Sequence, residues 1–333
     1  MNRFLRRIFW FVLPVAAAAA GAEWGLRSIP HQLGYKAAYM ERHAPQIEVL
    51  SLGLSHAFYG LDFHASKFRG FNLAYHGQPL DRDLELWEKY AGRLTSLRGV
   101  VISLSCWSIH HRLRKDGEQW RVPFYTINYD LPGPWYAFKE RYIIAYPSPA
   151  FRYLKHALSP GDIRAEGNTP QDEFGSYMVL RDNRRPDWDQ RTAEGVARNH
   201  SAFDPEDVAH NREVLRRIAA DCAARGVRMV LYTPPTWPTY YEHLSDEVVA
   251  LTRQIGTSLA REFPNVRYVD LLKDRRFTAD DLPRTSTTTT EARSSSASST
   301  TRSPRTLSRQ NNSQKTHSEA AARMDFEKLF LFL

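Results

Sequence analysis

The chain has little cysteine and carries no motif for metal or nucleic-acid binding. Of its 333 residues, 2 are cysteines, Cys106 and Cys222, which lie far apart and lack the spacing of metal ligands. So few thiols exclude a disulfide framework, and their apolar neighbours favour two buried free thiols. The net charge is +8, but neither a concentrated basic face nor zinc-finger spacing accompanies it. We therefore expect no metal, no dissociable cofactor and no nucleic-acid partner.

The N-terminus has the pattern of a membrane-targeting segment. Arginines at positions 3, 6 and 7 precede a run without charge from Ile8 to Ala22. This run alone is shorter than the ~20 residues that cross a bilayer comfortably. Residues 1–26 are therefore expected to be an uncleaved anchor or a signal peptide cleaved after Ala22, and a buried N-terminal helix is the alternative. In either targeting form the arginines stay inside and the body is exported. An anchored form would lie in the inner membrane with its body in the periplasm or outside the cell, and a cleaved form would be secreted.

A short apolar strand that runs into a glycine turn is the most informative stretch. The residues from Ile47 to Leu52 are mostly aliphatic, and Gly53-Leu54-Ser55-His56 follows them directly. Glycine permits a tight turn that a side chain would block, and the residues after Ser55 can open a helix. A strand, a turn and a helix in this order place Ser55 at the carboxyl edge of a parallel sheet, where ligands bind in α/β proteins.

The remaining apolar pattern predicts an α/β fold, with a doubly wound, flavodoxin-like and mostly parallel sheet of about five strands. The further strands are expected over 68–74, 98–105, 227–232 and 266–271, with helices over 81–94, 204–225 and 246–263. An aromatic-rich insertion over 107–200, with a helical piece around 136–158, interrupts the pattern. This insertion either shapes a substrate cleft or forms a packing or partner surface.

Three short motifs in this order resemble the SGNH, or GDSL-like, hydrolase and acyltransferase superfamily. They are the serine stretch 50–57, the pair 71–74 and 77–79, and the late Leu231-Tyr232-Thr233-Pro234-Pro235. The likeness is nearest to membrane-anchored bacterial envelope proteins of the D-alanyl transfer protein type. It covers about residues 47–281 outside the insertion, and it implies an SGNH-like α/β domain over 45–283. It implies an exported enzyme that needs no cofactor and moves an acyl group to or from an envelope glycan or carrier.

The resemblance also implies roles for individual residues. Ser55 matches the nucleophile, and its own N–H and that of Gly77 match two oxyanion donors. Ser105 stands where the family usually has an asparagine as the third donor. The expected Asp-x-x-His or Asp-x-His after the last strand does not follow Asp270.

Several other polar side chains are candidates for contacts at the same sheet edge. His56 adjoins the serine, and Tyr240 and His243 follow the fourth strand, so these three are candidates for substrate contact. His110 and His111 follow the third strand and either face the cleft or lie in solvent. Each of these side chains has a plain structural alternative, such as a solvated loop or a helix start.

The chain changes character near Pro283. Residues 284–333 are rich in Ser, Thr, Arg and Gln, a composition that predicts disorder. The tail is either a natural low-complexity segment or the product of a reading-frame shift. Read one base earlier, the codons from Thr285 to Arg293 can encode Asp-Val-Asp-His-Tyr-Asn-Gly-Gly-Ala, which contains the missing Asp and His. On this interpretation the chain as written is inactive or nearly so.

The sequence leaves two classes of function open. The first is an exported serine esterase or O-acyltransferase that acts on a cell-envelope glycan or carrier. The second is a non-catalytic envelope scaffold, for polysaccharide assembly for example, that binds protein partners or glycan through the insertion. The missing base favours the second class, and the serine turn favours the first.

Overall fold

The structure is a computed structural model that describes residues 2–277 apart from 65, 114, 116–117, 132–137, 148–149, 152–153, 155–170 and 177–189. Its centre is a five-stranded, all-parallel sheet in the order β2-β1-β3-β4-β5. The strands are β1 (Val49–Leu52), β2 (Gly70–Asn72), β3 (Gly99–Ser103), β4 (Arg228–Thr233) and β5 (Val266–Asp270). This order confirms the doubly wound, flavodoxin-like α/β fold expected from the sequence.

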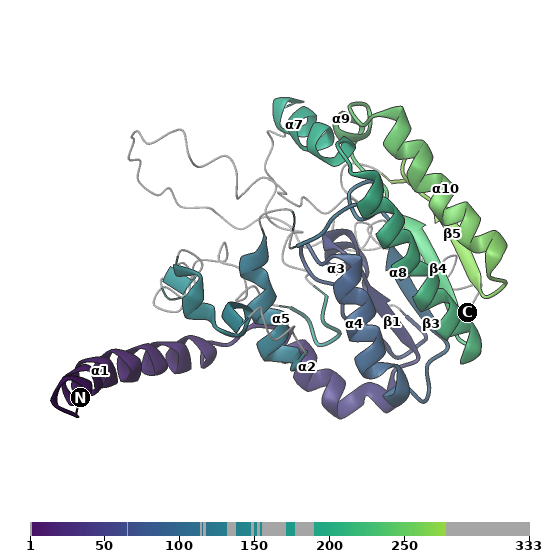
Figure 1. The fold of residues 1–333 in the computed structure, drawn as a ribbon. Helices are drawn as coiled ribbons and strands as arrows, with labels where there is room; N and C mark the ends of the chain where they lie inside the picture. Colours follow the sequence, from purple (N-terminus) through teal and green to yellow (C-terminus); the bar gives the residue numbers. More distant parts are fainter. Residues whose placement is uncertain are drawn as a thin grey trace, which may run out of the picture.

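Helices α4, α8 and α10 lie side by side along one face of the sheet (Figure 1). The α-helices in the described part that have complete bounds are α1 (Asn2–Arg27), α2 (Gln32–His43), α3 (Ser55–Gly60), α4 (Leu80–Tyr90), α5 (Val122–Tyr129), α7 (Gln190–Ser201), α8 (Pro205–Ala224), α9 (Pro238–Tyr241) and α10 (Asp246–Glu262). Short 3-10 helices are η1 (Ala44–Gln46), η2 (Ala91–Arg93), η3 (Gln119–Arg121), η4 (Phe138–Arg141) and η5 (Ile143–Ala145).

The helix boundaries follow from local chemistry. The side chain of Asp204 accepts a hydrogen bond from the N–H of Glu206 at the start of α8, and the hydroxyl of Ser245 accepts one from the N–H of Val248 at the start of α10. Gly226 ends α8 with a positive φ of 68°, a conformation that glycine adopts without a steric cost. The three helices expected from the sequence therefore begin and end within a few residues of their predicted positions.

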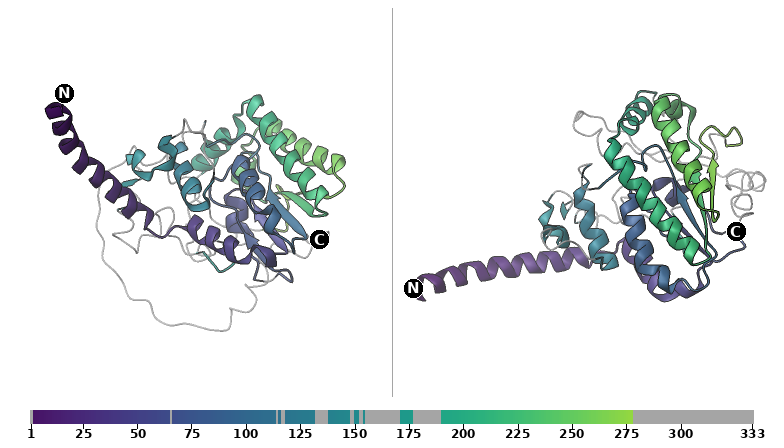
Figure 2. Two further views of the ribbon diagram at one scale, coloured as in Figure 1. Left: turned by 60° about the horizontal axis from the view of Figure 1, so that its bottom comes forward. Right: turned by 45° about the vertical axis from the view of Figure 1, so that its right-hand side comes forward.

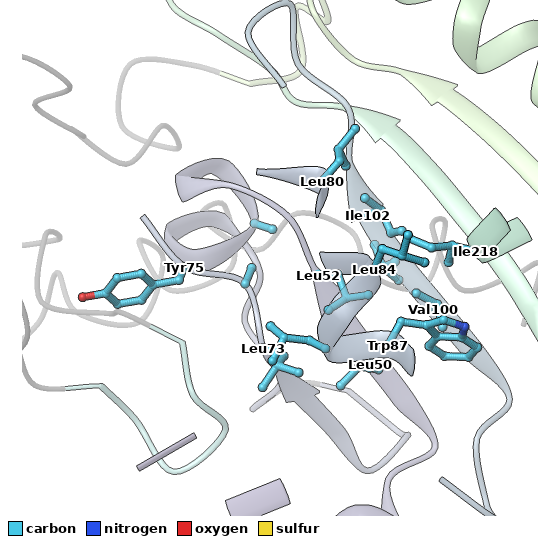
Figure 3. Packing of buried hydrophobic residues seen from close by; sticks show 14 of the residues in the cluster. Leu50, Leu52, Leu73, Tyr75, Leu80, Leu84, Trp87, Val100, Ile102 and Ile218 are labelled. Atoms are coloured by element: carbon cyan, nitrogen blue, oxygen red, sulfur yellow. The ribbon is translucent and has the colours of Figure 1, made fainter. Parts of the chain in front are cut away.

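The core lies between the sheet and these helices. Leu84 and Trp87 of α4 face Val100 and Ile102 of β3 (Figure 3), and all four are buried. Every residue of β1 and β3 is buried, as expected for central parallel strands covered on both faces. Cys106 and Cys222 are buried free thiols, which confirms the expectation from the sequence.

Helix α1 projects away from the body in every view (Figure 1, Figure 2). Its stretch Arg3–Arg27 spans 25 residues and is long and apolar enough to cross a membrane or to serve as a signal sequence. The first residue of the apolar run, Ile8, and most of those after it are exposed along the helix. This confirms the expected targeting segment in its general form.

The insertion contains short helical pieces rather than one continuous helix in its described part. Where a helical piece over 136–158 was expected, η4 and η5 form separate turns, and Pro147, Ala150, Phe151 and Leu154 also have helical backbone. Proline disfavours helical backbone in the residue before it, which accounts for the break ahead of Pro147. The predicted tail, residues 284–333, lies outside the described residues.

Candidate functional site

Ser55 lies at the carboxyl edge of the sheet, three residues after the end of β1. Gly53 follows the strand with a φ of 115°, and Ser55 is the first residue of α3. A Cβ atom on Gly53 would lie 2.4 Å from the hydroxyl oxygen of Ser103 in β3. Only glycine fits there, because the conformation is strained for other residues and the neighbouring strand occupies the space. Ser55 itself is 2% exposed.

Two side chains from neighbouring elements hold the backbone of this turn. Asp83 Oδ1 accepts hydrogen bonds from the N–H of Gly53, at 2.9 Å, and from Nε2 of Gln78, at 2.6 Å. The hydroxyl of Ser103 accepts a hydrogen bond from the N–H of Leu54 at 3.3 Å. Burial raises the pKa of Asp83 to about 7, although both hydrogen bonds oppose the rise. A buried carboxyl group thus fixes the position of the turn.

The loop after β2 lies against the same turn. The N–H of Tyr75 donates to the carbonyl of Gly53 at 3.1 Å, and Gly77 has a positive φ of 60°. The guanidinium of Arg121 covers Gly77 closely, because a Cβ there would lie 2.1 Å from its Nη1 atom. The same Nη1 donates to the carbonyl of His76 at 2.7 Å. The structure therefore brings the predicted Gly77 beside the serine turn and adds a buried cation that the sequence did not reveal.

A buried lysine lies against α3, the helix that begins at Ser55. Lys36 of α2 donates to the backbone carbonyls of Asn72, at 2.8 Å, and of Ala74, and its Nζ sits 4.4 Å from the ring centroid of Phe58. The Asn72 side chain in turn donates to the Ala57 carbonyl at 2.8 Å. Burial holds the pKa of Lys36 well below its ordinary value. Lys36 and Asn72 thus connect α2, the loop after β2 and α3.

Ser105 closes a local turn after β3. Its hydroxyl accepts a hydrogen bond from the N–H of Ser108 at 3.1 Å, and its own N–H donates to the Ser108 hydroxyl at 2.8 Å. The Ser108 hydroxyl also donates to the Ser105 carbonyl. The residue predicted as the third oxyanion donor is therefore engaged within its own turn.

A cluster of histidines surrounds Trp107 beyond the same edge. His200 of α7 stacks on Trp107 with ring centroids 5.0 Å apart, and Trp107 also lies 4.0 Å from the ring of His111. Burial, reinforced by nearby histidine charges, lowers the pKa of His200 to about 3. His110 Nε2–H donates to the His200 carbonyl at 3.2 Å. His200 is therefore neutral near pH 7, and it packs with Trp107 and His111 in a largely buried aromatic layer.

The remaining predicted contact residues separate in the structure. Nδ1 of His200 and the hydroxyl of Tyr240 share a hydrogen bond of 2.7 Å, so Tyr240 joins the histidine cluster. His243 instead donates from Nδ1 to the Thr239 carbonyl at 2.7 Å and pairs with Glu194 at 3.2 Å. Burial lowers the pKa of His56 to about 4, and no described residue bonds its buried Nδ1.

Sequence reasoning missed Asp83, Lys36, Arg121 and His200, but two of them left a signal. Asp83 lies three residues after Leu80 and four before Trp87, so its helix position belongs to the buried stripe. Lys36 lies in the same way between Leu33 and Met40. A charged residue within an apolar stripe indicates a buried polar contact. The other two lie in the insertion, where no periodic pattern exists.

Within the described residues, no group of three or more His, Cys, Asp or Glu side chains could hold a metal ion. Comparisons with protein-family models, with curated proteins and with solved structures find no match to this chain.

Proposed function

We propose that this chain is an exported serine esterase or O-acyltransferase of the SGNH type that acts on a cell-envelope glycan or acyl carrier. The observation that supports this most directly is the position of Ser55, which follows the Gly53 turn at the carboxyl end of β1. The Ser55 oxygen attacks an acyl carbonyl, and a base takes the hydroxyl proton and passes it to the departing alkoxide. The oxygen of a sugar hydroxyl or of water then attacks the acyl carbon of the acyl-enzyme, and its proton passes through the base to the departing Ser55 oxygen.

The backbone around Ser55 is suited to stabilise the oxyanion of this reaction. Among the described residues, no backbone carbonyl accepts a hydrogen bond from the N–H of Ser55 or of Gly77. Both N–H groups are therefore available as the two oxyanion donors that the resemblance implies. The Arg121 guanidinium beside Gly77 adds positive potential on the same side.

The reaction also needs a general base, and three described histidines near the site are already engaged in other contacts. His111 donates to the Gly77 carbonyl at 3.1 Å, and His110 and His200 are engaged within the aromatic cluster. We propose that the catalytic Asp and His are encoded after Pro283 in a different reading frame. The chain as written then retains only the residual rate that oxyanion stabilisation and binding provide.

Labelling with a fluorophosphonate probe tests the nucleophile. A chain in which the frame is restored by one base after Pro283 should label strongly, and its Ser55→Ala variant should not label. Ser258→Ala, in α10 and remote from the turn, is the matched control and should label like the parent. Equal labelling of the Ser55→Ala variant and its parent would exclude Ser55 as the nucleophile.

A second candidate is a non-catalytic envelope scaffold. It is favoured by the burial of Ser55, which is 2% exposed, and by the hydrogen bonds that engage His110 and His111 with backbone carbonyls. Pull-down from membranes separates the two proposals. Retention of the same partners by the Ser55→Ala protein, without acyl turnover in the frame-restored parent, would favour the scaffold. Turnover that disappears in Ser55→Ala would favour the enzyme.

A further inference from the structure

Exposed apolar side chains of the body gather in one short segment. Outside α1, the large hydrophobic residues of the described chain that are exposed are Tyr35, Ile144, Phe151 and Leu154, at 41%, 37%, 67% and 46%. Three of these four lie within residues 143–154. Phe151 and Leu154 both have helical backbone, and their side chains are exposed. Trp24, near the end of α1, is 75% exposed.

Specific hydrogen bonds fix this segment to the end of α1. The buried carboxylate of Glu23 accepts hydrogen bonds from the N–H of Ile143, at 3.1 Å, and of Ile144, at 2.9 Å. Arg27 donates to Glu23 at 2.7 Å and to the carbonyl of Arg141 at 2.7 Å. Figure 1 shows the segment beside the C-terminal end of α1, on the side from which α1 leaves the body. The apolar residues therefore lie where the chain would emerge from a bilayer.

The chemistry of this region matches a lipid surface. Tryptophan is enriched at the boundary between hydrocarbon and headgroups, which is where Trp24 would lie if α1 crosses the membrane. Lys139 and Arg141 are exposed a few residues before Ile144 in the chain, and basic residues at this level attract anionic lipid headgroups. Apolar and basic groups together are the composition of a segment that lies in the interface.

We propose that the described residues 138–147, 150, 151 and 154 form a peripheral membrane-binding surface, which we call the interface segment. Its residues Ile144, Phe151 and Leu154 enter the headgroup region of the anionic bilayer that α1 crosses. Glu23 couples the two, so the segment and α1 hold the body at a fixed height and orientation above the membrane. The inference rests on α1 entering the bilayer and is independent of any acyl chemistry.

Depth-dependent quenching tests the interface segment in the full chain. Because Cys106 and Cys222 are buried, one added cysteine gives a single site for an NBD fluorophore. The variants are Phe151→Cys, Glu213→Cys at an exposed position of α8 as the negative control and Leu13→Cys within α1 as the positive control. Each is placed in phosphatidylcholine–phosphatidylglycerol vesicles that contain nitroxide lipids labelled near the headgroup.

The expected result is quenching of the Phe151→Cys probe about threefold or more above that of Glu213→Cys. Adding Ile144→Ser and Leu154→Ser should weaken quenching at position 151 and leave the Leu13→Cys signal unchanged. Adding Tyr35→Ser, at an exposed residue outside the segment, should change neither signal.

Two different failures can be told apart. If Leu13→Cys is quenched but Phe151→Cys behaves like Glu213→Cys, then α1 enters the bilayer and the interface segment does not, which overturns the proposal. If Leu13→Cys is also unquenched, then the membrane premise itself is wrong and the proposal falls with it. Neither result depends on whether Ser55 is a nucleophile.

Discussion

Replacing Asp83 with Asn should stabilise the protein above about pH 7 and leave its stability nearly unchanged near pH 3. The carboxyl group is fully buried and accepts two hydrogen bonds at Oδ1, while no described residue bonds its Oδ2. Asparagine keeps a carbonyl oxygen that can accept both hydrogen bonds. It also resembles the protonated acid, because it is neutral at every pH.

The direction follows from the pKa of Asp83 in the two states. Burial raises the pKa from an ordinary 3.8 to about 7 in the folded protein. Below pH 3.8 the acid is protonated in both states, and its stabilising effect is fully present. Between pH 3.8 and 7 the unfolded chain ionises while the folded protein keeps its proton, so stability falls as the pH rises. Above pH 7 both states are ionised and the loss is complete.

The size of the effect follows from the same two values. A pKa that rises by roughly three units corresponds to about 4 kcal/mol of unfolding free energy. Relaxation around the ionised carboxylate makes this an upper bound. We therefore expect the Asp83→Asn variant to gain between about 1 and 4 kcal/mol over the wild type at pH 8, and close to nothing at pH 3.

Urea unfolding of the full chain in detergent, followed by tryptophan fluorescence from pH 3 to pH 8, measures this difference. Asp83→Leu is the contrasting variant, because it leaves the N–H of Gly53 and the amide of Gln78 without their acceptor and should destabilise at every pH by about 2–5 kcal/mol. Glu247→Gln, at an exposed position of α10, is the control and should show no such pH dependence. A wild type that is more stable than Asp83→Asn at pH 8 would refute the reasoning.

Three further changes test other parts of the structure. Gly53→Ala should destabilise the folded protein by about 2 kcal/mol or more in thermal melts, because its Cβ would lie 2.4 Å from the hydroxyl of Ser103 in β3. Gly92→Ala is the control, and it should be neutral within about 0.5 kcal/mol because the space around Gly92 is open. Lys36→Met should cost about 1–3 kcal/mol in urea unfolding, since two buried carbonyls lose their donor. A Lys36→Met variant as stable as the parent would contradict the buried contact. Glu23→Gln should speed amide hydrogen exchange in residues 143–145, and unchanged protection there would show that the carboxylate does not hold η5.

The sheet could be predicted from the sequence because its strands carry strong local signals. β1 and β3 are buried on both faces, so their residues read as continuous apolar runs. The strand expected over 68–74 shortens to Gly70–Asn72, since the residues after it leave the sheet to form the loop around Gly77. Helix ends were predictable where a cap or glycine marks them, as at Ser245 and Gly226.

The site was predictable only where local backbone chemistry defines it. Gly53 and Ser55 follow a strand directly, so their turn is visible in the sequence. The support around that turn depends on contacts between distant residues, such as Lys36 with the carbonyl of Asn72 and His200 with Tyr240. No spacing rule relates such pairs, because the fold alone brings them together.

Peptide mapping tests the central claim most directly. The frame-restored chain is treated with a fluorophosphonate, digested and analysed by tandem mass spectrometry. The account predicts one adduct, on the peptide that contains Ser55, which is lost when an acyl substrate analogue protects the site. An adduct on a different serine with Ser55 unmodified, or no adduct at all in the frame-restored chain, would contradict the proposal that Ser55 is an acyl-accepting nucleophile.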